Sequence, residues 1–255
     1  MKHSARAFMA ICLGLLLCIP VLAQNITGNG HVQKETRNHS GFTGVQVGGA
    51  FDVILTQGSS YRVIIESDDN VLPHIKTKVE NGVLKIHTKG NFRKVNTMKA
   101  YVTLPELDKL DVSGAADVIG KSTFRTHKMD IGSSGASDIV LAIEVNELHC
   151  GISGSADINL SGTADEVHMG VSGSGDLNGE ELYARRGKAG ISGSGSVKVH
   201  LSDALTASVS GAGDIVCYGN PSSRTVQTSG SGEVHFAGGG STTPVKKPSN
   251  SGKVY

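Results

Sequence analysis

The chain has 255 residues, of which 34 are glycine; it contains no tryptophan, and aromatic residues make up only 4% of it. So few large side chains exclude a thick conventional core and favour a thin core of small β-branched residues. The 24 basic residues balance 23 acidic ones, for a formal net charge of +1, so nothing in the charge draws the chain to nucleic acid or to an acidic membrane surface.

The segment 1–23 is typical of a signal peptide. A short basic start precedes an apolar run, and the residues that follow suit cleavage by signal peptidase after Ala23. Two alternatives are a retained membrane helix, against which the short run and Pro20 argue, and lipidation at Cys18, against which the bulky Leu17 argues. We therefore expect an exported protein of the periplasm, the outer membrane surface or the medium, with no membrane span in the mature chain.

An N-terminal β-subdomain is expected over residues 40–108, after a linker at residues 24–39. Residues 61–66 and 98–104 alternate between apolar and polar side chains, which predicts strands. Asn81 and Gly82 lie between two alternating arms, which predicts a β-hairpin. We expect this subdomain to include the first rung of the repeat region and to cover one of its open ends, because unpaired strand edges invite aggregation.

A short motif that repeats over residues 109–236 is the strongest signal in the chain. Its glycine recurs at a nearly constant spacing, at Gly114, Gly135, Gly154, Gly173, Gly193, Gly211 and Gly230. A diverged copy precedes these at residues 47–53. The number of residues between successive glycines is too small for a pair of helices and suits one coil of a β-solenoid. The prediction is an all-β fold, a right-handed parallel β-helix of about eight rungs, its hand following from the general crossover rule.

Three apolar columns are expected to fill the solenoid, with a rung spacing of about 4.8 Å. The first is Val53, Val118, Ile139, Ile158, Leu177, Val197, Ile215 and Val234. The second is Leu55, Gly120, Leu141, Leu160, Gly179, Val199, Cys217 and Phe236. The third is Val47, Val112, Ile152, Val171, Ile191, Val209 and Thr228. The copy around Gly135 breaks the third column, and we expect a bulge to bring Ile131 into the vacant place.

An acidic column follows the corner glycines, and two interpretations of it stay open. Its members are Asp52, Asp117, Asp138, Asp157, Asp176, Ser196, Asp214 and Glu233. Stacked carboxylates repel one another, and bound Ca²⁺ would relieve that repulsion. Alternatively, each carboxylate accepts hydrogen bonds from backbone N–H groups of the tight corner. Ser196 interrupts the column, which capping tolerates better than a metal row, so we predict capping and no metal site.

Two cysteines, Cys150 and Cys217, remain once the signal peptide is removed, and both are expected to face the core. Counting corner glycines separates them by three rungs, or about 14 Å along the solenoid. That distance exceeds the limit of about 7 Å between the Cα atoms of a disulfide. We therefore predict two buried free thiols that behave as small apolar side chains.

No arrangement of residues points to catalysis or to a cofactor. His149 and His168 lie one repeat apart and are expected to stack on an exposed strand face rather than to bind a metal. The Gly-x-Gly strings lack a following helix, so no phosphate-binding loop is implied. The serines that follow Gly151 and Gly190 lie in repeat corners, not in nucleophile elbows. We predict no catalytic, cofactor-binding or metal-binding residues.

Several segments resemble one bacterial family. The relevant stretches are 41–47 with 51–57, then 68–73 followed by 81–86, and the repeated Ser-Gly-Ser-Gly-Asp pattern. Over about residues 40–236 the chain resembles the family described as "putative auto-transporter adhesin, head GIN domain". The resemblance implies an exported envelope or surface protein, common in Bacteroidetes-type bacteria, with a β-helical fold and no family catalytic residues.

These observations favour a non-enzymatic envelope or surface protein whose polar solenoid faces bind a glycan or a surface protein. A structural scaffold of the envelope without an external ligand is the alternative. A polysaccharide-acting enzyme is more remote, because the close and even spacing of the corner glycines leaves no room for the long loops of a catalytic cleft. The tail at residues 237–255 is polar and rich in glycine, and we expect it to be disordered.

Overall fold

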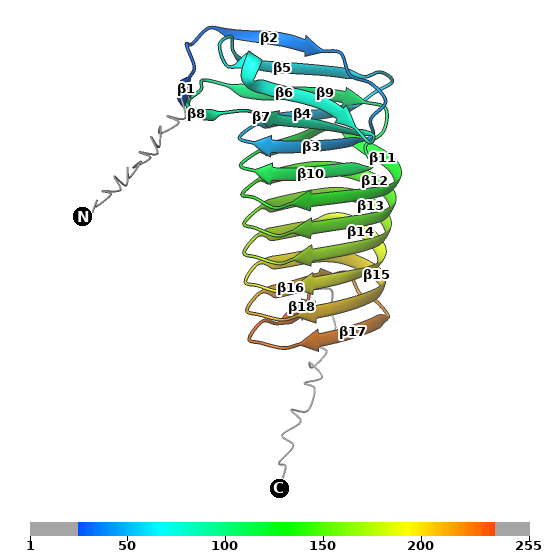
Figure 1. The fold of residues 1–255 in the computed structure, drawn as a ribbon. Coiled ribbons are helices and arrows are strands. Elements are labelled where there is room, and N and C mark those ends of the chain that lie inside the picture. The colour runs from blue at the N-terminus through cyan, green and yellow to red at the C-terminus, as the bar shows by residue number, and fades with distance from the viewer. Residues whose placement is uncertain (1–24, 238–255) are drawn as a thin grey trace, which may run out of the picture.

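The computed structural model describes residues 25–237, which are mostly β-stranded. Strands make up 69% of the structure and form a solenoid of about seven turns, so the predicted all-β solenoid is confirmed. The one helical element among the described residues is the short 3-10 helix η1 (Leu72–His74). Figure 1 shows the rungs stacked in a column with the N-terminal strands over one end. The expected signal peptide and residues 238–255 of the expected tail lie outside the described residues.

Each central coil is one long bent strand that is closed by a short corner. The five long strands are β11 (Asp117–Ser133), β12 (Asp138–Ile152), β13 (Asp157–Val171), β14 (Asp176–Ile191) and β15 (Ser196–Val209). Shorter strands complete the ends: β3 (Gly44–Gly49), β4 (Asp52–Gln57), β10 (Lys109–Gly114), β16 (Asp214–Tyr218), β17 (Ser223–Thr228) and β18 (Val234–Phe236). Neighbouring coils pair in parallel, so equivalent motif positions lie directly over one another.

The first apolar column stacks as the repeat predicts. Ile158 pairs with Leu177, and the column continues through Val197 to Ile215. All four side chains are fully buried. The diverged first copy joins the same column, because Val53 pairs with the equivalent valine of β11. Equal spacing in the sequence therefore becomes equal position in the core.

The expected place of Ile131 in the third column is wrong. Ser133 occupies that place, paired with Val112 on one side and Ile152 on the other. The extra length of this repeat lies instead on the far side of the coil, where the register shifts between Ile119 and Thr123. A serine is tolerated in this dry column because its hydroxyl lies 2.7 Å from that of the buried Ser137, so each hydroxyl has a hydrogen-bond partner.

The corner glycines are required by close stacking of the backbone. A Cβ atom added to Gly173 would lie 2.2 Å from the carbonyl oxygen of Gly154, and one added to Gly193 would lie 2.2 Å from that of Gly173. These corners are also bonded to one another, since Ser174 N donates to Gly154 O at 2.9 Å. Any side chain at these positions would push neighbouring rungs apart.

The N-terminal strands continue the sheet of the solenoid beyond its first rung along two branches. Strand β3 is followed by β7 (Val83–Thr88) and β6 (Ile75–Glu80), and β4 is followed by β9 (Met98–Leu104), β5 (Arg62–Asp68) and β2 (Val32–Arg37). The predicted hairpin is β6–β7. Its turn residues Asn81 and Gly82 have φ of 51° and 74°, the left-handed conformation that such turns require.

The segment 24–39, expected to be a linker, contributes strands instead. Strand β2 pairs antiparallel with β5, and β1 (Asn25–Thr27) pairs with β8 (Asn91–Lys94). Almost every side chain of β2 is exposed, so its sequence lacks the alternating pattern by which strands are recognised. Strand β2 is held in the sheet by backbone pairing with β5 and by a hydrogen bond that a buried carboxylate accepts from the adjoining loop.

That carboxylate belongs to Asp68, which is fully buried at the end of β5. It accepts hydrogen bonds from Gly30 N at 2.6 Å, from Asn96 N at 2.9 Å and from Asn96 Nδ2 at 2.9 Å. Burial on its own would raise the pKa of Asp68, but the hydrogen bonds from Asn96 and Gly30 outweigh it and hold the pKa below its usual value. Asp68 thus joins the loop before β2 to the loop before β9, the two strands that flank β5.

Candidate functional site

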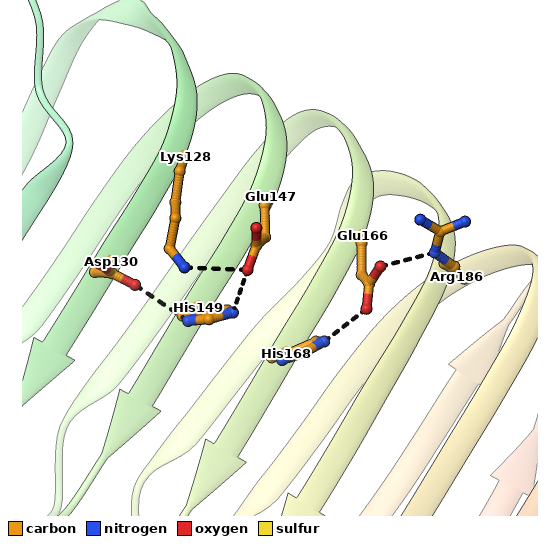
Figure 2. Close-up of polar contacts among 7 residues, drawn as sticks. All are labelled: Lys128, Asp130, Glu147, His149, Glu166, His168 and Arg186. Carbon is orange, nitrogen blue, oxygen red and sulfur yellow. Dashed lines mark hydrogen bonds and ion pairs between the residues drawn. The ribbon is translucent and has the colours of Figure 1, made fainter.

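One outer face of the solenoid carries a row of charged side chains across strands β11 to β14, here called the charged ladder (Figure 2). Its members are Lys128, Asp130, Glu147, His149, Glu166, His168 and Arg186. The parallel register creates it, because Lys128 pairs with Glu147, Glu147 with Glu166, and Glu166 with Arg186. Residues one repeat apart in the sequence therefore meet as neighbours on one surface.

The first half of the charged ladder centres on His149. Its Nδ1 lies 3.2 Å from Asp130 Oδ1, and its Nε2 lies 2.7 Å from Glu147 Oε1. Lys128 Nζ lies 3.1 Å from the same Glu147 oxygen. The hydrogen bond from Lys128 holds the pKa of Glu147 below its usual value despite some desolvation. The imidazole of His149 therefore lies between two carboxylates, with each ring nitrogen within ion-pair distance of one of them.

The second half repeats this arrangement one rung further on. Glu166 accepts hydrogen bonds from Arg186 Nε at 2.7 Å and from His168 Nε2 at 2.8 Å. Mainly through the Arg186 contact, and then through His168, the pKa of Glu166 is lowered to about 2. The imidazole rings of His149 and His168 stack with their centroids 4.7 Å apart and their planes 12° apart. The predicted stacking of these two histidines is confirmed.

Beside the charged ladder runs a strip of bare backbone, here called the glycine groove. Its floor is Gly132, Gly151, Gly170 and Gly190, which pair in register across four strands. The floor ends where Asp111 precedes Gly132 and Ser208 follows Gly190. The span from Asp111 to Ser208 is five rung spacings, or about 24 Å.

Three of the four floor glycines are not demanded by the fold. A Cβ atom added to Gly151, Gly170 or Gly190 would meet no atom within 4 Å. None of the three has the positive φ that favours glycine. Glycine in the middle of a strand weakens it, because it loses more conformational freedom on folding than alanine. The glycines of three successive rungs therefore lower the stability of their strands, and they leave the outer surface of these rungs without side chains.

Polar side chains form both rims of the glycine groove. On one side lie the His149 and His168 rings, and on the other the corner hydroxyls of Ser153, Ser172 and Ser192. Open hollows of about 420, 460 and 340 Å³ follow the floor and its rims. The groove is shallow, elongated and continuous from rung to rung, and its walls offer hydroxyl, carboxylate and imidazole groups.

A second exposed feature lies on another side of the coil. Tyr183, with 57% of its surface exposed, stacks on His200 with ring centroids 4.4 Å apart, and His200 faces Tyr218 at 6.4 Å. The three rings are tilted against one another by 50° and 30°. The three rings occupy successive rungs, and of the three only Tyr183 is exposed, whereas His200 and Tyr218 are partly buried.

The acidic column lies on the outside of the corners, as its spacing implies. Asp176 Oδ1 accepts hydrogen bonds from Ser196 N at 3.0 Å and from Ser196 Oγ at 2.8 Å. Asp214 Oδ1 accepts one from Glu233 N at 2.9 Å. At these two rungs the carboxylate caps the backbone of the next coil, which is the capping arrangement. Within residues 25–237 no three His, Cys, Asp or Glu side chains gather so that they could hold a metal ion.

Cys150 and Cys217 are both buried and unbonded to each other, as predicted. Burial raises the pKa of Cys150 to about 12 and that of Cys217 to about 11. Thiolates are the reactive form of cysteine, so both groups are unreactive near neutral pH. They pack as apolar members of the core.

Three comparisons place this architecture among known proteins. The model of the family described as "Putative auto-transporter adhesin, head GIN domain" matches residues 41–221. The chain belongs to this family. Its head GIN domain thus runs from the loop before β3 to just before β17, and includes the charged ladder and the glycine groove. No curated protein matches the chain.

Solved structures share the head GIN fold at low identity. A putative adhesin from Bacteroides fragilis NCTC 9343 matches with a TM-score of 0.81 and 22% identity, over 83% of this chain and 100% of its own. A putative adhesin from Parabacteroides merdae ATCC 43184 matches with a TM-score of 0.67 and 21% identity, over 83% and 99%. A putative lipid binding protein from Parabacteroides distasonis ATCC 8503 matches with a TM-score of 0.69 and 23% identity, over 84% and 100%. At such identities the likeness establishes the fold alone.

Sequence reasoning located the histidine stack but missed the glycine groove and the ion pairs beside it. The signal was present, since Gly132, Gly151, Gly170 and Gly190 recur at the period of the repeat, two positions before each corner serine. Only the structure separates these open glycines from the close-packed corner glycines. In the part of the chain that the structure describes, no helix is long and apolar enough to cross a membrane.

Proposed function

We propose that this protein is an exported, non-enzymatic, adhesin-like protein of the cell envelope that binds a glycan along the glycine groove. The observation that carries the proposal is the run of three floor glycines that neither sterics nor φ requires. Family membership supports an adhesin-like surface protein. Keeping an outer strip free of side chains is useful when another molecule must approach the backbone closely.

The chemistry of the rims favours a polyhydroxylated ligand over an apolar one. Serine hydroxyls on one side both donate and accept hydrogen bonds, and the carboxylates of Asp111 and Asp130 beside the floor accept them. The imidazoles beside the floor add a flat polarisable edge. A glycan strand has alternating hydroxyl donors and acceptors along its length, so it matches a groove whose groups repeat at every rung.

Several features speak for binding rather than catalysis. The coils carry no long loops, because only a short corner separates one long strand from the next. The carboxylates of the charged ladder are held by Lys128, Arg186 and the histidines, and the pKa of Glu166 is lowered rather than raised. A general acid needs a carboxyl group whose pKa is raised towards neutrality, which is the opposite of this arrangement.

A glycan array probed with mature protein, from residue 24 onward, tests the proposal. Gly151→Thr with Gly170→Thr fills the groove with residues that favour strands, and we expect at least a tenfold loss of binding without a loss of fold. Val140→Thr, at an exposed strand position of β12, is the matched control and should bind like the wild type. Undiminished binding by the double variant, or loss only in Tyr183→Ala, would show that the ligand lies elsewhere.

Export is tested separately. Mass determination of the protein recovered from cells should show cleavage after Ala23, and protease treatment of intact cells should remove the solenoid if it faces outward. A protein that keeps residues 1–23, or one protected in intact cells, would contradict the surface placement. A mature protein that binds no glycan but is cleaved from the surface would favour the structural scaffold instead.

A further inference from the structure

The far end of the solenoid presents open strand edges. Strand β17 pairs with β15 on one side, and β18 pairs with β16 on one side. Neither has a second strand partner within residues 25–237. Val226, Val234 and Phe236 lie at this end, packed against the core and only partly buried. Exposed edges of this kind are templates for pairing with another chain.

The opposite end is protected in a way that this end is not. There the outermost strands of the sixteen-stranded sheet are β2 and β6, each of which pairs with a single strand. Each carries three charged side chains: Lys34, Glu35 and Arg37 on β2, and Lys76, Lys78 and Glu80 on β6. Charged edge strands resist pairing because ions must be desolvated. Strand β17 carries one charged side chain, Arg224, whose guanidinium carbon lies 4.3 Å from the centre of the Phe236 ring.

The sequence that follows Ala237 is a poor match for these edges. Residues 238–255 include three successive glycines and two prolines, and their few apolar residues do not alternate with polar ones. Proline lacks the N–H group that a strand must donate, and glycine weakens strands. A second copy of the same edge, in contrast, already has strand conformation and the correct alternation.

We propose that the open end binds a second copy of this chain, with β17 pairing antiparallel to its own copy about a two-fold axis. In β17 the even positions point inward and the odd positions outward, as the burial pattern shows. Two conditions select the register: inward-facing positions must lie opposite inward-facing positions, and Arg224 must not lie opposite an apolar residue. Both conditions are met when the two-fold axis passes through Val226. Val226 then faces its own copy, Arg224 faces Thr228 of the other copy, and Thr225 faces Gln227.

This arrangement closes on itself. The surface is the same on both copies, so it makes an isologous contact. Because the outermost strands of the other end, β2 and β6, carry charged edges that resist pairing, the product is a dimer rather than a filament. No like charges meet across the paired β17 strands, since its single charged side chain lies opposite a threonine.

A charge-swap pair of variants tests the contact, with molar mass measured by light scattering after gel filtration across micromolar concentrations. The wild-type mature protein should have twice the chain mass. Thr225→Glu with Gln227→Glu places like charges directly opposite each other and should give monomers. Thr225→Lys with Gln227→Glu differs at one position, places opposite charges there, and should remain dimeric. Far-UV circular dichroism confirms that all three are folded.

Disulfide trapping tests the register. In Thr225→Cys with Gln227→Cys, the paired positions would lie about 4.5 to 5.5 Å apart between Cα atoms, within the range that a disulfide spans. Oxidation should therefore give a covalent dimer. A wild-type protein that is monomeric at every concentration overturns the proposal, as does a charge-swap pair that behaves identically. Dimerisation that appears only after removal of residues 238–255 would show that the tail, not a second copy, covers the edge.

Discussion

Replacing Gly173 and Gly170 separately by alanine tests the difference between the corner and the groove. In Gly173→Ala the new methyl would lie 2.2 Å from the carbonyl oxygen of Gly154, so the rungs must separate locally by about 1 Å to reach ordinary contact distance. Overpacking of this kind lowers the free energy of unfolding by about 1 to 3 kcal/mol. Weakening the hydrogen bond from Ser174 N to Gly154 O adds about 1 kcal/mol.

Gly170→Ala, three positions earlier, should behave in the opposite way. No atom lies within 4 Å of the added methyl, and alanine restricts the unfolded chain more than glycine does. The free energy of unfolding should rise by about 0.4 to 1 kcal/mol. The two variants should therefore differ by about 2.5 to 5 kcal/mol, although they have the same amino-acid composition.

Urea unfolding followed by far-UV circular dichroism measures both variants at the same pH, with the slope of the transition as a check on the unfolding mechanism. A Gly173→Ala variant as stable as the wild type would refute the claim that the corners stack by direct backbone contact. A Gly170→Ala variant destabilised as strongly as Gly173→Ala would refute the open floor of the glycine groove, and with it the main support for ligand binding there.

Three further predictions concern buried polar groups. Asp68→Asn should lower the free energy of unfolding by about 1 to 3 kcal/mol at neutral pH, because an amide cannot accept all the bonds that the carboxylate accepts. Since the pKa of Asp68 is lowered by folding, the wild type should lose this advantage in acid, as pH falls from the usual carboxyl range through the folded-state value. Ser133→Val should be destabilising by about 1 to 2 kcal/mol through the orphaned Ser137 hydroxyl, whereas Ser133→Val with Ser137→Ala should recover most of the loss. A thiol reagent should label neither cysteine of the mature native protein at neutral pH and both in denaturant; rapid native labelling would contradict their burial.

What the sequence by itself determined is the repeat geometry. Parallel pairing in register converts equal spacing into equal position, so the stacking of Ile158 over Leu177 and of His149 over His168 could be derived without coordinates. The same argument separated the two cysteines and predicted that both are free. The hairpin at Asn81 and Gly82 followed from local turn chemistry, which depends on neighbouring residues alone.

The tertiary structure decided whatever depends on neighbours from other rungs. Ser133 and Ile131 differ by two positions, so alternation places both inside, and only the register across β10, β11 and β12 shows which belongs to the third column. The sequence of strand β2 shows no alternation of apolar and polar residues, because the strand lies at the edge of the sheet with its side chains exposed. Its place is fixed by backbone pairing with β5. Glycines at the corners and in the groove have the same period, and only the space around each glycine in the folded chain tells the two sets apart. Periodicity specifies which residues stack, whereas packing specifies what each stack touches.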